Sequence, residues 1–370
     1  MEKKSYVSPG QITAMLLTIR LLFLTPHLIS LHAGHSLQDI LPAVIVAYFL
    51  NFLLAAPMLL LLNRHQGKDL IECADASLGN GTSKVIALLY FLYLGLYNIL
   101  VQNWFCSFFI DAVNSATNSY AILIPLFVII IYGACKGFES ISRFATIVFI
   151  LFFIMIILLL CTLIPSISTP GGIHLFFPLF YNGPNIFLKE ILNQMNSNSE
   201  IIALGICMSF VKSGHKSSSI FFKYNSFAHI VIFILLALCV AVLGPFGSVQ
   251  NFPLQTMASE SVISVFERLD SLYNMSWVLT TILHTVLYTF LQAQCLTKMG
   301  LNRHRKIAIT IIAVLNFLGV LVVRTFIPES TNFTANNYIS VINLFAILIL
   351  PFIILMGDLF KGRSTKHEMA

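Results

Sequence analysis

The chain has 370 residues, of which 58% are apolar and only 10% are charged, and its mean hydropathy is +0.88. Soluble domains contain about a quarter charged residues, so the composition excludes a soluble globular domain and indicates a polytopic membrane protein. The net charge of +6 is informative through its distribution along the chain rather than as a sign of nucleic-acid binding. The seven cysteines have no CxxC spacing and mostly lie in apolar runs, which favours buried small residues over metal or redox sites.

Apolar windows of about 20 residues predict an all-α protein of ten transmembrane helices, forming a single transmembrane domain over residues 1–370. Lys3 and Lys4 are not followed by a short apolar region with a cleavage site, so we expect the first span to be retained. Ser8-Pro9 resembles a helix cap followed by a first-turn proline. The predicted helices cover 11–31, 37–62, 84–110, 121–135, 142–164, 190–211, 226–247, 271–296, 307–327 and 338–358.

The first helix contains a charge and a break. Arg20 lies about a dozen residues into the helix, and Thr25-Pro26 follows it. A proline at this position removes a backbone hydrogen bond and interrupts the helix. The alternative for Arg20 is snorkelling to the membrane interface, although its depth favours an internal partner or a ligand.

Three histidines follow this break, at His27, His32 and His35. They do not share one helical face, and the second and third should lie in the next loop, so no metal site is expected. The chain has no Walker loop, no hydrolase triad and no nucleotide fingerprint. We therefore expect neither an enzyme nor a cofactor.

Polar residues also occur in two other spans. A stripe along the third helix either lines a cavity or packs against neighbouring helices, and the polar groups of the eighth helix favour interhelical hydrogen bonds over catalysis. The first set is Tyr90, Tyr93, Tyr97, Asn98, Gln102 and Asn103, and the second is His284, Gln292 and Gln294.

The sixth span carries the most polar segment inside an apolar run. Six of the seven residues from Gln194 to Glu200 are polar, with the sequence Gln-Met-Asn-Ser-Asn-Ser-Glu. Such groups in lipid must face protein, water or a ligand. Two interrupted helices at corresponding positions of two five-helix halves indicate an inverted-repeat transporter fold with broken helices one and six. The predicted substrate-binding residues are Arg20, Thr25, Pro26, Tyr97, Asn196, Ser197, Asn198, Ser199 and Glu200.

Arg20 and Glu200 have two alternative roles. They could neutralise each other as a buried pair, or Arg20 could bind the carboxylate of an amino-acid-like ligand with Glu200 near the amine. The sequence leaves both alternatives open.

The distribution of Lys and Arg predicts the orientation. Of 21 such residues, a cytoplasmic N-terminus places 17 in the inner loops and tails and three (Lys189, Arg268 and Arg324) outside, with Arg20 inside the first helix. This asymmetry follows the positive-inside rule. Both termini are therefore expected in the cytoplasm, and the long loop 165–189, rich in Pro, Gly and aromatic residues, is expected to cover the outer mouth.

Four segments resemble one protein family. Residues 132–147, including Lys136-Gly-Phe-Glu139 and Arg143, resemble the short loop between helices four and five of the spore germination permease family. Phe177-Pro-Leu-Phe-Tyr-Asn-Gly183 resembles its outer-loop motif, and 266–277 resembles its entry to helix eight. Glu200 and the loop that follows it match its sixth helix, so the resemblance extends from about residue 10 to 360.

This family consists of the B subunits of nutrient germinant receptors and belongs to the amino acid–polyamine–organocation transporter superfamily. The resemblance implies helices one and six broken around a substrate, a nutrient such as an amino acid, and a place in the spore inner membrane. It also implies two partners, an A subunit and a lipoprotein C subunit.

The chain departs from the family pattern at the expected site. Arg20 and bulky residues replace a glycine-containing run in the first helix, and Ser-Asn-Ser precedes Glu200 where family members often carry glycine. These departures weaken the expectation of an apolar amino-acid ligand. The hypotheses are a germinant-sensing receptor subunit, a proton- or sodium-coupled amino-acid or amine permease, and a structural subunit that has lost ligand binding.

Overall fold

The structure is a computed structural model, and the part of it described below is helical apart from an isolated bridge between Val7 and Val211. Six helices in this part are long and apolar enough to cross a membrane. Apolar side chains cover much of their outward surface, as expected for contact with lipid. The described residues are 6–22, 40–113, 116–164, 167, 183–212, 214–250, 252–261, 269–301, 304–326 and 337–367.

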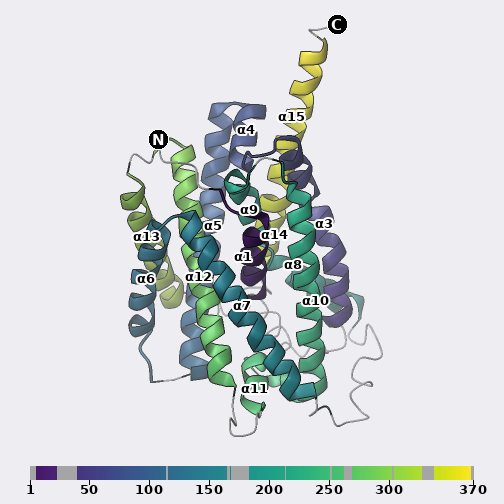
Figure 1. Ribbon diagram of the computed structural model, residues 1–370, viewed down its shortest axis with the longest axis vertical. Coiled ribbons are helices and arrows are strands. Elements are labelled where there is room, and N and C mark those ends of the chain that lie inside the picture. The colour runs from purple at the N-terminus through teal and green to yellow at the C-terminus, as the bar shows by residue number, and fades with distance from the viewer. Residues whose placement is uncertain are drawn as a thin grey trace.

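The first half of the chain contains α1, four longer helices and the short α4, which lies at one end of the molecule (Figure 1). A π-helical turn, Phe109–Val113, extends α5. The helices of this half are α1 (Pro9–Leu22), α3 (Ile40–Arg64), α4 (Leu70–Leu78), α5 (Asn80–Phe108), α6 (Ser119–Cys135) and α7 (Phe138–Leu163).

The second half begins with two short helices in succession, α8 and α9, and ends with a helix that is divided by a π-helical segment, Phe345–Ile349. Its short α11 lies at the opposite end of the molecule from α4 (Figure 1). The helices are α8 (Pro184–Asn196), α9 (Glu200–Cys207), α10 (Ser217–Leu243), α11 (Pro253–Glu260), α12 (Asp270–Lys298), α13 (Arg305–Phe326), α14 (Asn337–Leu344) and α15 (Leu350–His367).

Helices at corresponding positions of the two halves pack against each other. The second helix of the first half, α3, packs on α10, while α5 packs on α12 and α6 on α13. The short helices α4 and α11 each follow the first long helix of their half, α3 or α10, and lie at opposite ends of the molecule, as an inverted repeat requires. The central α1 contacts α7, α9, α10 and α12 (Figure 1). The polar break of the second half therefore lies next to α1.

Several helices differ from the predicted ranges, and among them α8 begins at Pro184 rather than 190 and α15 ends at His367 rather than 358. The helix α10 begins at Ser217, well before the expected start at 226, because the polar Tyr224 and Asn225 at its beginning are buried in the protein rather than exposed to lipid. The helix α4 was not expected at all, although the spacing of Asp69 and Glu72 is that of a capping box.

Charged residues connect the helices at the α4 end. The Asp69 side chain accepts from the Glu72 backbone N–H and caps α4. Lys298, at the end of α12, forms ion pairs with both carboxylates, at 3.1 Å from Asp69. Burial raises the pKa of the Asp69 carboxyl above its ordinary value. The nearby Lys298 ammonium lowers this pKa, but by less than burial raises it. Asp358 of α15 likewise binds Arg64 at the end of α3, at 3.2 Å.

Candidate substrate-binding site

The discontinuity between α8 and α9 spans Ser197 to Ser199. The first of these residues has φ −93° and ψ 17° and ends α8, and no side chain caps the start of α9 at Ser199. The carboxyl end of α8 and the amino end of α9 meet here, so a partial negative charge and a partial positive charge lie side by side. All residues from Asn196 to Glu200 are buried.

Side chains from other helices satisfy the last carbonyl groups of α8. The Asn196 carbonyl accepts from the Tyr97 hydroxyl at 2.7 Å and from the Asn343 amide at 2.8 Å. The Asn343 Oδ1 in turn accepts from Tyr93 at 2.8 Å and lies 2.6 Å from the Tyr97 hydroxyl, whose single hydrogen is shared between this oxygen and the Asn196 carbonyl. The carbonyl of Gln194 accepts from Arg20 Nη2 at 3.1 Å. The break is therefore fixed by α1, α5 and α14.

Arg20 and Glu200 lie together at this break. The Arg20 Nε and Glu200 Oε1 atoms are 3.8 Å apart, and the two side chains are 1% and 2% exposed. Arg20 contacts the carboxyl end of α8, while Glu200 occupies the first turn of α9, so each charge lies at the helix end that favours it. Because Arg20 is buried, it does not snorkel to the membrane surface.

Several buried polar atoms around this pair have no hydrogen-bond partner within the described residues. At 3.8 Å the pair is too long for a hydrogen bond, and two of the three guanidinium nitrogens of Arg20 and Glu200 Oε2 remain open. A cluster of open donors and acceptors at buried charges is the arrangement that a small polar ligand requires. The other such atoms nearby are Gln194 Nε2, Ser197 Oγ, Asn198 Oδ1, Tyr224 OH and Asn225 Nδ2.

A second set of contacts ties the break to α3 and α10. The Asn198 amide donates to Asn51 Oδ1. The Asn51 amide in turn lies 3.4 Å from Asn225 Oδ1 and 3.2 Å from His229 Nε2. Asn51 therefore connects the break to both helices.

On the opposite side of the break, the Ser199 hydroxyl lies 2.7 Å from the Tyr288 hydroxyl of α12. The Tyr288 ring stacks on His284, with ring centroids 3.8 Å apart. The discontinuity is therefore held between α3 and α10 on one side and α12 on the other.

The structure brings six of the predicted site residues to one place, whereas two others lie outside the described residues. Thr25 and Pro26 are these two, and His27, His32 and His35, which were not expected to bind a metal, also lie outside the described residues. Away from the break, Asn98 donates to Thr289 at 2.9 Å and Gln292 accepts from Asn316 at 2.9 Å, both between neighbouring helices. The six residues brought together are Arg20, Asn196, Ser197, Asn198, Ser199 and Glu200, with Tyr97 bonded to them.

Five residues of this site were not identified from the sequence. Each is a buried polar side chain in an otherwise apolar span, which is costly in a membrane unless a partner is present. Isolated polar residues in apolar windows were therefore the available signal. They are Asn51, Asn225, His229, Tyr288 and Asn343.

Comparison with solved structures gives three transporters that share this fold. Mhp1, a nucleobase-cation-symport-1 family transporter in a closed conformation with bromovinylhydantoin bound, has a TM-score of 0.64 and 13% identity over 90% of this chain and 75% of its own. A substrate-bound, outward-open Na+-coupled sialic acid symporter has a TM-score of 0.65 and 9% identity over 95% of this chain and 90% of its own. MhsT in complex with L-phenylalanine has a TM-score of 0.63 and 12% identity over 97% of this chain and 99% of its own. At these identities the similarity establishes the inverted-repeat transporter fold.

The family comparison is more specific. The family described as spore germination protein matches residues 40–334, which is most of the chain, whereas comparison with curated proteins gave no match. The proteins of this family and the structural neighbours are permeases and transporters, not enzymes. The chain is therefore a multi-pass membrane protein that belongs to the spore germination permease family.

Proposed function

We propose that the chain is the membrane subunit of a nutrient germinant receptor, and that a small nutrient with both a carboxylate and an amine binds at the α8–α9 break. The observation that supports this proposal is the pair of buried, opposite charges at the break, each with open hydrogen-bonding positions. A guanidinium binds a carboxylate through two parallel hydrogen bonds. The carboxylate of Glu200 is suited to the ligand amine.

The distance between the charges implies how binding could produce a signal. The 3.8 Å between Arg20 Nε and Glu200 Oε1 leaves no room for a ligand between these atoms. A zwitterion that binds between these two atoms must therefore move α1 and α9 apart. A ligand shifts a conformational equilibrium only through such a difference in contacts. Separation of the two helices is the change that partner subunits would detect.

Orientation and partners are part of the same proposal. The positive-inside rule favours the α4 end as the cytoplasmic side. Lys84 lies near the start of α5, Lys216 directly precedes α10 and Lys298 ends α12, and these helix ends lie at the α4 end. Family membership supports assembly with an A subunit and a lipoprotein C subunit in the spore inner membrane.

The test is a germination screen with a strain that lacks this gene, complemented with the wild-type gene or with Arg20→Met. The wild-type gene should restore germination by one or more amino acids or related zwitterions in a nutrient panel, and Arg20→Met should not. Arg143→Met is the matched control, because Arg143 is exposed and pairs with Glu139 one helical turn away. Equal responses of the deletion strain and the wild type to every nutrient would reject the receptor role.

Transport is the second candidate function, and the shared fold of three solved transporters favours it. Uptake of the radiolabelled germinant by vesicles containing the chain distinguishes the two. A permease accumulates the compound when a proton or sodium gradient is applied. A receptor binds it and shows no gradient-driven accumulation.

A further inference from the structure

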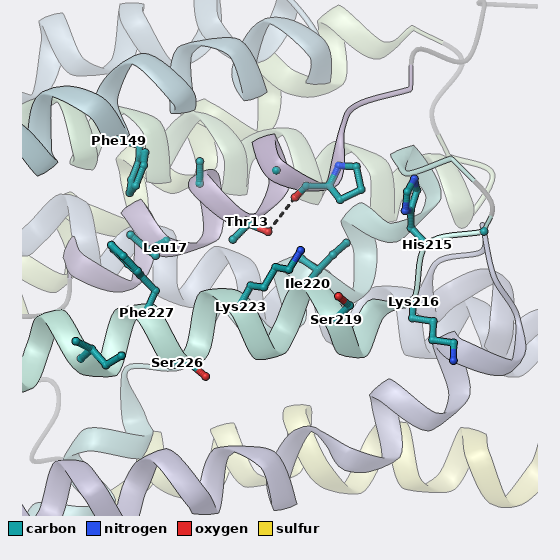
Figure 2. Close-up of a pocket in the computed structure, with 15 residues that line it drawn as sticks. Thr13, Leu17, Phe149, His215, Lys216, Ser219, Ile220, Lys223, Ser226 and Phe227 are labelled. Carbon is teal, nitrogen blue, oxygen red and sulfur yellow. Dashed lines mark hydrogen bonds between the residues drawn. The ribbon is translucent and has the colours of Figure 1, made fainter.

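A groove of about 910 Å³ opens between α1, α7 and α10. Its two ends differ in chemistry. Figure 2 shows His215 and Lys216 toward one end, Lys223 midway along the groove, and Phe149 and Phe227 toward the other end. Among the described residues, no Asp or Glu lines the groove.

The basic side chains of the groove lack counter-charges. His215, Lys216 and Lys223 are exposed, and neither lysine forms an ion pair within the part of the chain that the structure describes. Other cations at this end of the protein do have carboxylate partners, such as Lys298 with Asp69. The groove therefore has a net positive charge that no neighbouring carboxylate neutralises.

The position of the groove along α10 gives its depth. Lys216 immediately precedes the first residue of α10, Ser217, and Phe227 lies within the helix. A rise of 1.5 Å per residue separates these two positions by roughly 16 Å along the axis. The end with His215 and Lys216 is therefore at the membrane interface, the backbone of Lys223 lies about 10 Å further along the helix, and the aromatic end lies at the depth of the hydrocarbon.

We infer that this groove binds a phospholipid with an anionic headgroup. The headgroup phosphate lies among His215, Lys216 and Lys223, and one acyl chain lies along Leu17, Phe149 and Phe227. Basic pockets between transmembrane helices bind lipid headgroups in this way. A transmembrane helix of a partner would need carboxylates at the level of the lysines, and an apolar chain alone would leave these cations without a partner.

The experiment uses membranes of cells that express the full chain and a phosphatidylglycerol probe with a diazirine in its acyl chain. Illumination should attach the probe to peptides that contain Phe149 or Phe227, and unlabelled phosphatidylglycerol should compete more strongly than phosphatidylcholine. Lys216→Gln and Lys223→Gln should each lower the labelling roughly fivefold. The matched controls are the single variants Lys84→Gln and Lys306→Gln, each of which removes one charge from an exposed position outside the groove and should leave the labelling unchanged.

A second variant tests the apolar end independently of charge. Ala14→Trp places a large side chain in the groove and should remove the labelling while protein abundance stays normal. Equal competition by the two lipids, or unchanged labelling in the double variant of Lys216 and Lys223, would overturn the inference. Crosslinking of a Phe227 photoprobe to another protein instead of lipid would also overturn it and would identify the groove as a subunit contact.

Discussion

Arg20 and Glu200 combine a close approach with incomplete hydrogen bonding. A fully bonded buried ion pair would be a structural element, because removal of one partner leaves an uncompensated charge. Here the Arg20 Nη2 atom donates to the Gln194 carbonyl, while Arg20 Nε and Glu200 Oε1 remain 3.8 Å apart. The pair is neutral as a whole, yet both members retain capacity to bind a ligand.

The first prediction separates pairing from ligand binding. If the charges mainly neutralise each other, Arg20→Met or Glu200→Gln should destabilise the protein by about 3–5 kcal/mol, and the double variant should recover its abundance. If Arg20 binds the ligand carboxylate, Arg20→Met should remain abundant and lose its response to zwitterionic nutrients. Immunoblots of spore membranes and germination dose-response curves measure both quantities.

We expect ligand contact together with some mutual pairing. Arg143→Met and Glu139→Gln, which alter an exposed pair, are the matched controls. Normal abundance and unchanged dose-response curves in both single variants at Arg20 and Glu200 would contradict both roles.

At the scale of elements, the break between α8 and α9 depends on side chains donated by distant helices. Asn343 lies next to the π-helical segment that begins at Phe345, and its amide contacts Tyr93, Tyr97 and the Asn196 carbonyl. A helix that ends inside a membrane leaves carbonyl groups that nothing in lipid satisfies. Asn343 therefore acts as a cap for α8 supplied from α14.

The second prediction concerns this cap. Asn343→Leu should lower the thermal unfolding temperature, because it leaves the buried Asn196 carbonyl and Tyr93 hydroxyl short of partners at a cost of about 1–3 kcal/mol. The variant should also weaken nutrient binding, since α8 loses its fixed end. Thermal unfolding of the purified chain with and without nutrient measures both effects.

Asn80→Leu is the control, because Asn80 is exposed at the start of α5. Equal unfolding temperatures for Asn343→Leu and the wild type would show that the cap does not stabilise the break.

Packing between elements also depends on single small residues. Gly205 of α9 lies against Leu70 of α4, and an added Cβ would overlap the leucine side chain. This contact joins the helix that carries Glu200 to the charged network of Asp69 and Lys298. The close approach of Gly205 to Leu70 therefore leaves no space for a larger side chain between α9 and α4.

At the scale of the whole molecule, the third prediction tests the orientation. In a background with Cys135→Ala and Cys161→Ala, which removes the partly exposed thiols, an impermeant maleimide applied to intact cells should label Glu260→Cys but not Lys216→Cys. Glu260 is exposed in α11, at the end opposite α4. Both positions should react after permeabilisation. Labelling of position 216 in intact cells would invert the proposed topology.

The fourth prediction tests assembly. Because family membership supports a receptor complex, the abundance of this chain in spores should fall when the neighbouring gene for the A or C subunit is deleted. Quantitative immunoblots of spore membranes measure the change, and re-expression of the deleted subunit is the control. Unchanged abundance and germination in these deletions would favour a free permease.

The sequence by itself determined the class, the fold and the family. Long apolar windows identify membrane helices because the bilayer requires them, and the interrupted sixth helix with Glu200 indicated the inverted repeat. Arg20 and Glu200 were recognisable because single charges in apolar spans are rare and costly. The start of α10 was misjudged, since Tyr224 and Asn225 are polar yet buried against protein.

Only the tertiary structure decided which polar groups meet. Asn51 and Asn198 are 147 residues apart, and so are Asn196 and Asn343, and no local pattern encodes these contacts. Hydropathy reflects the free energy of transferring each residue out of water. The packing of α3, α8 and α14 determines which buried polar groups become hydrogen-bond partners. The groove of Lys216 and Phe227 also exists only because α1, α7 and α10 diverge there. Helix packing sets such distances, and it depends on contacts across the whole chain.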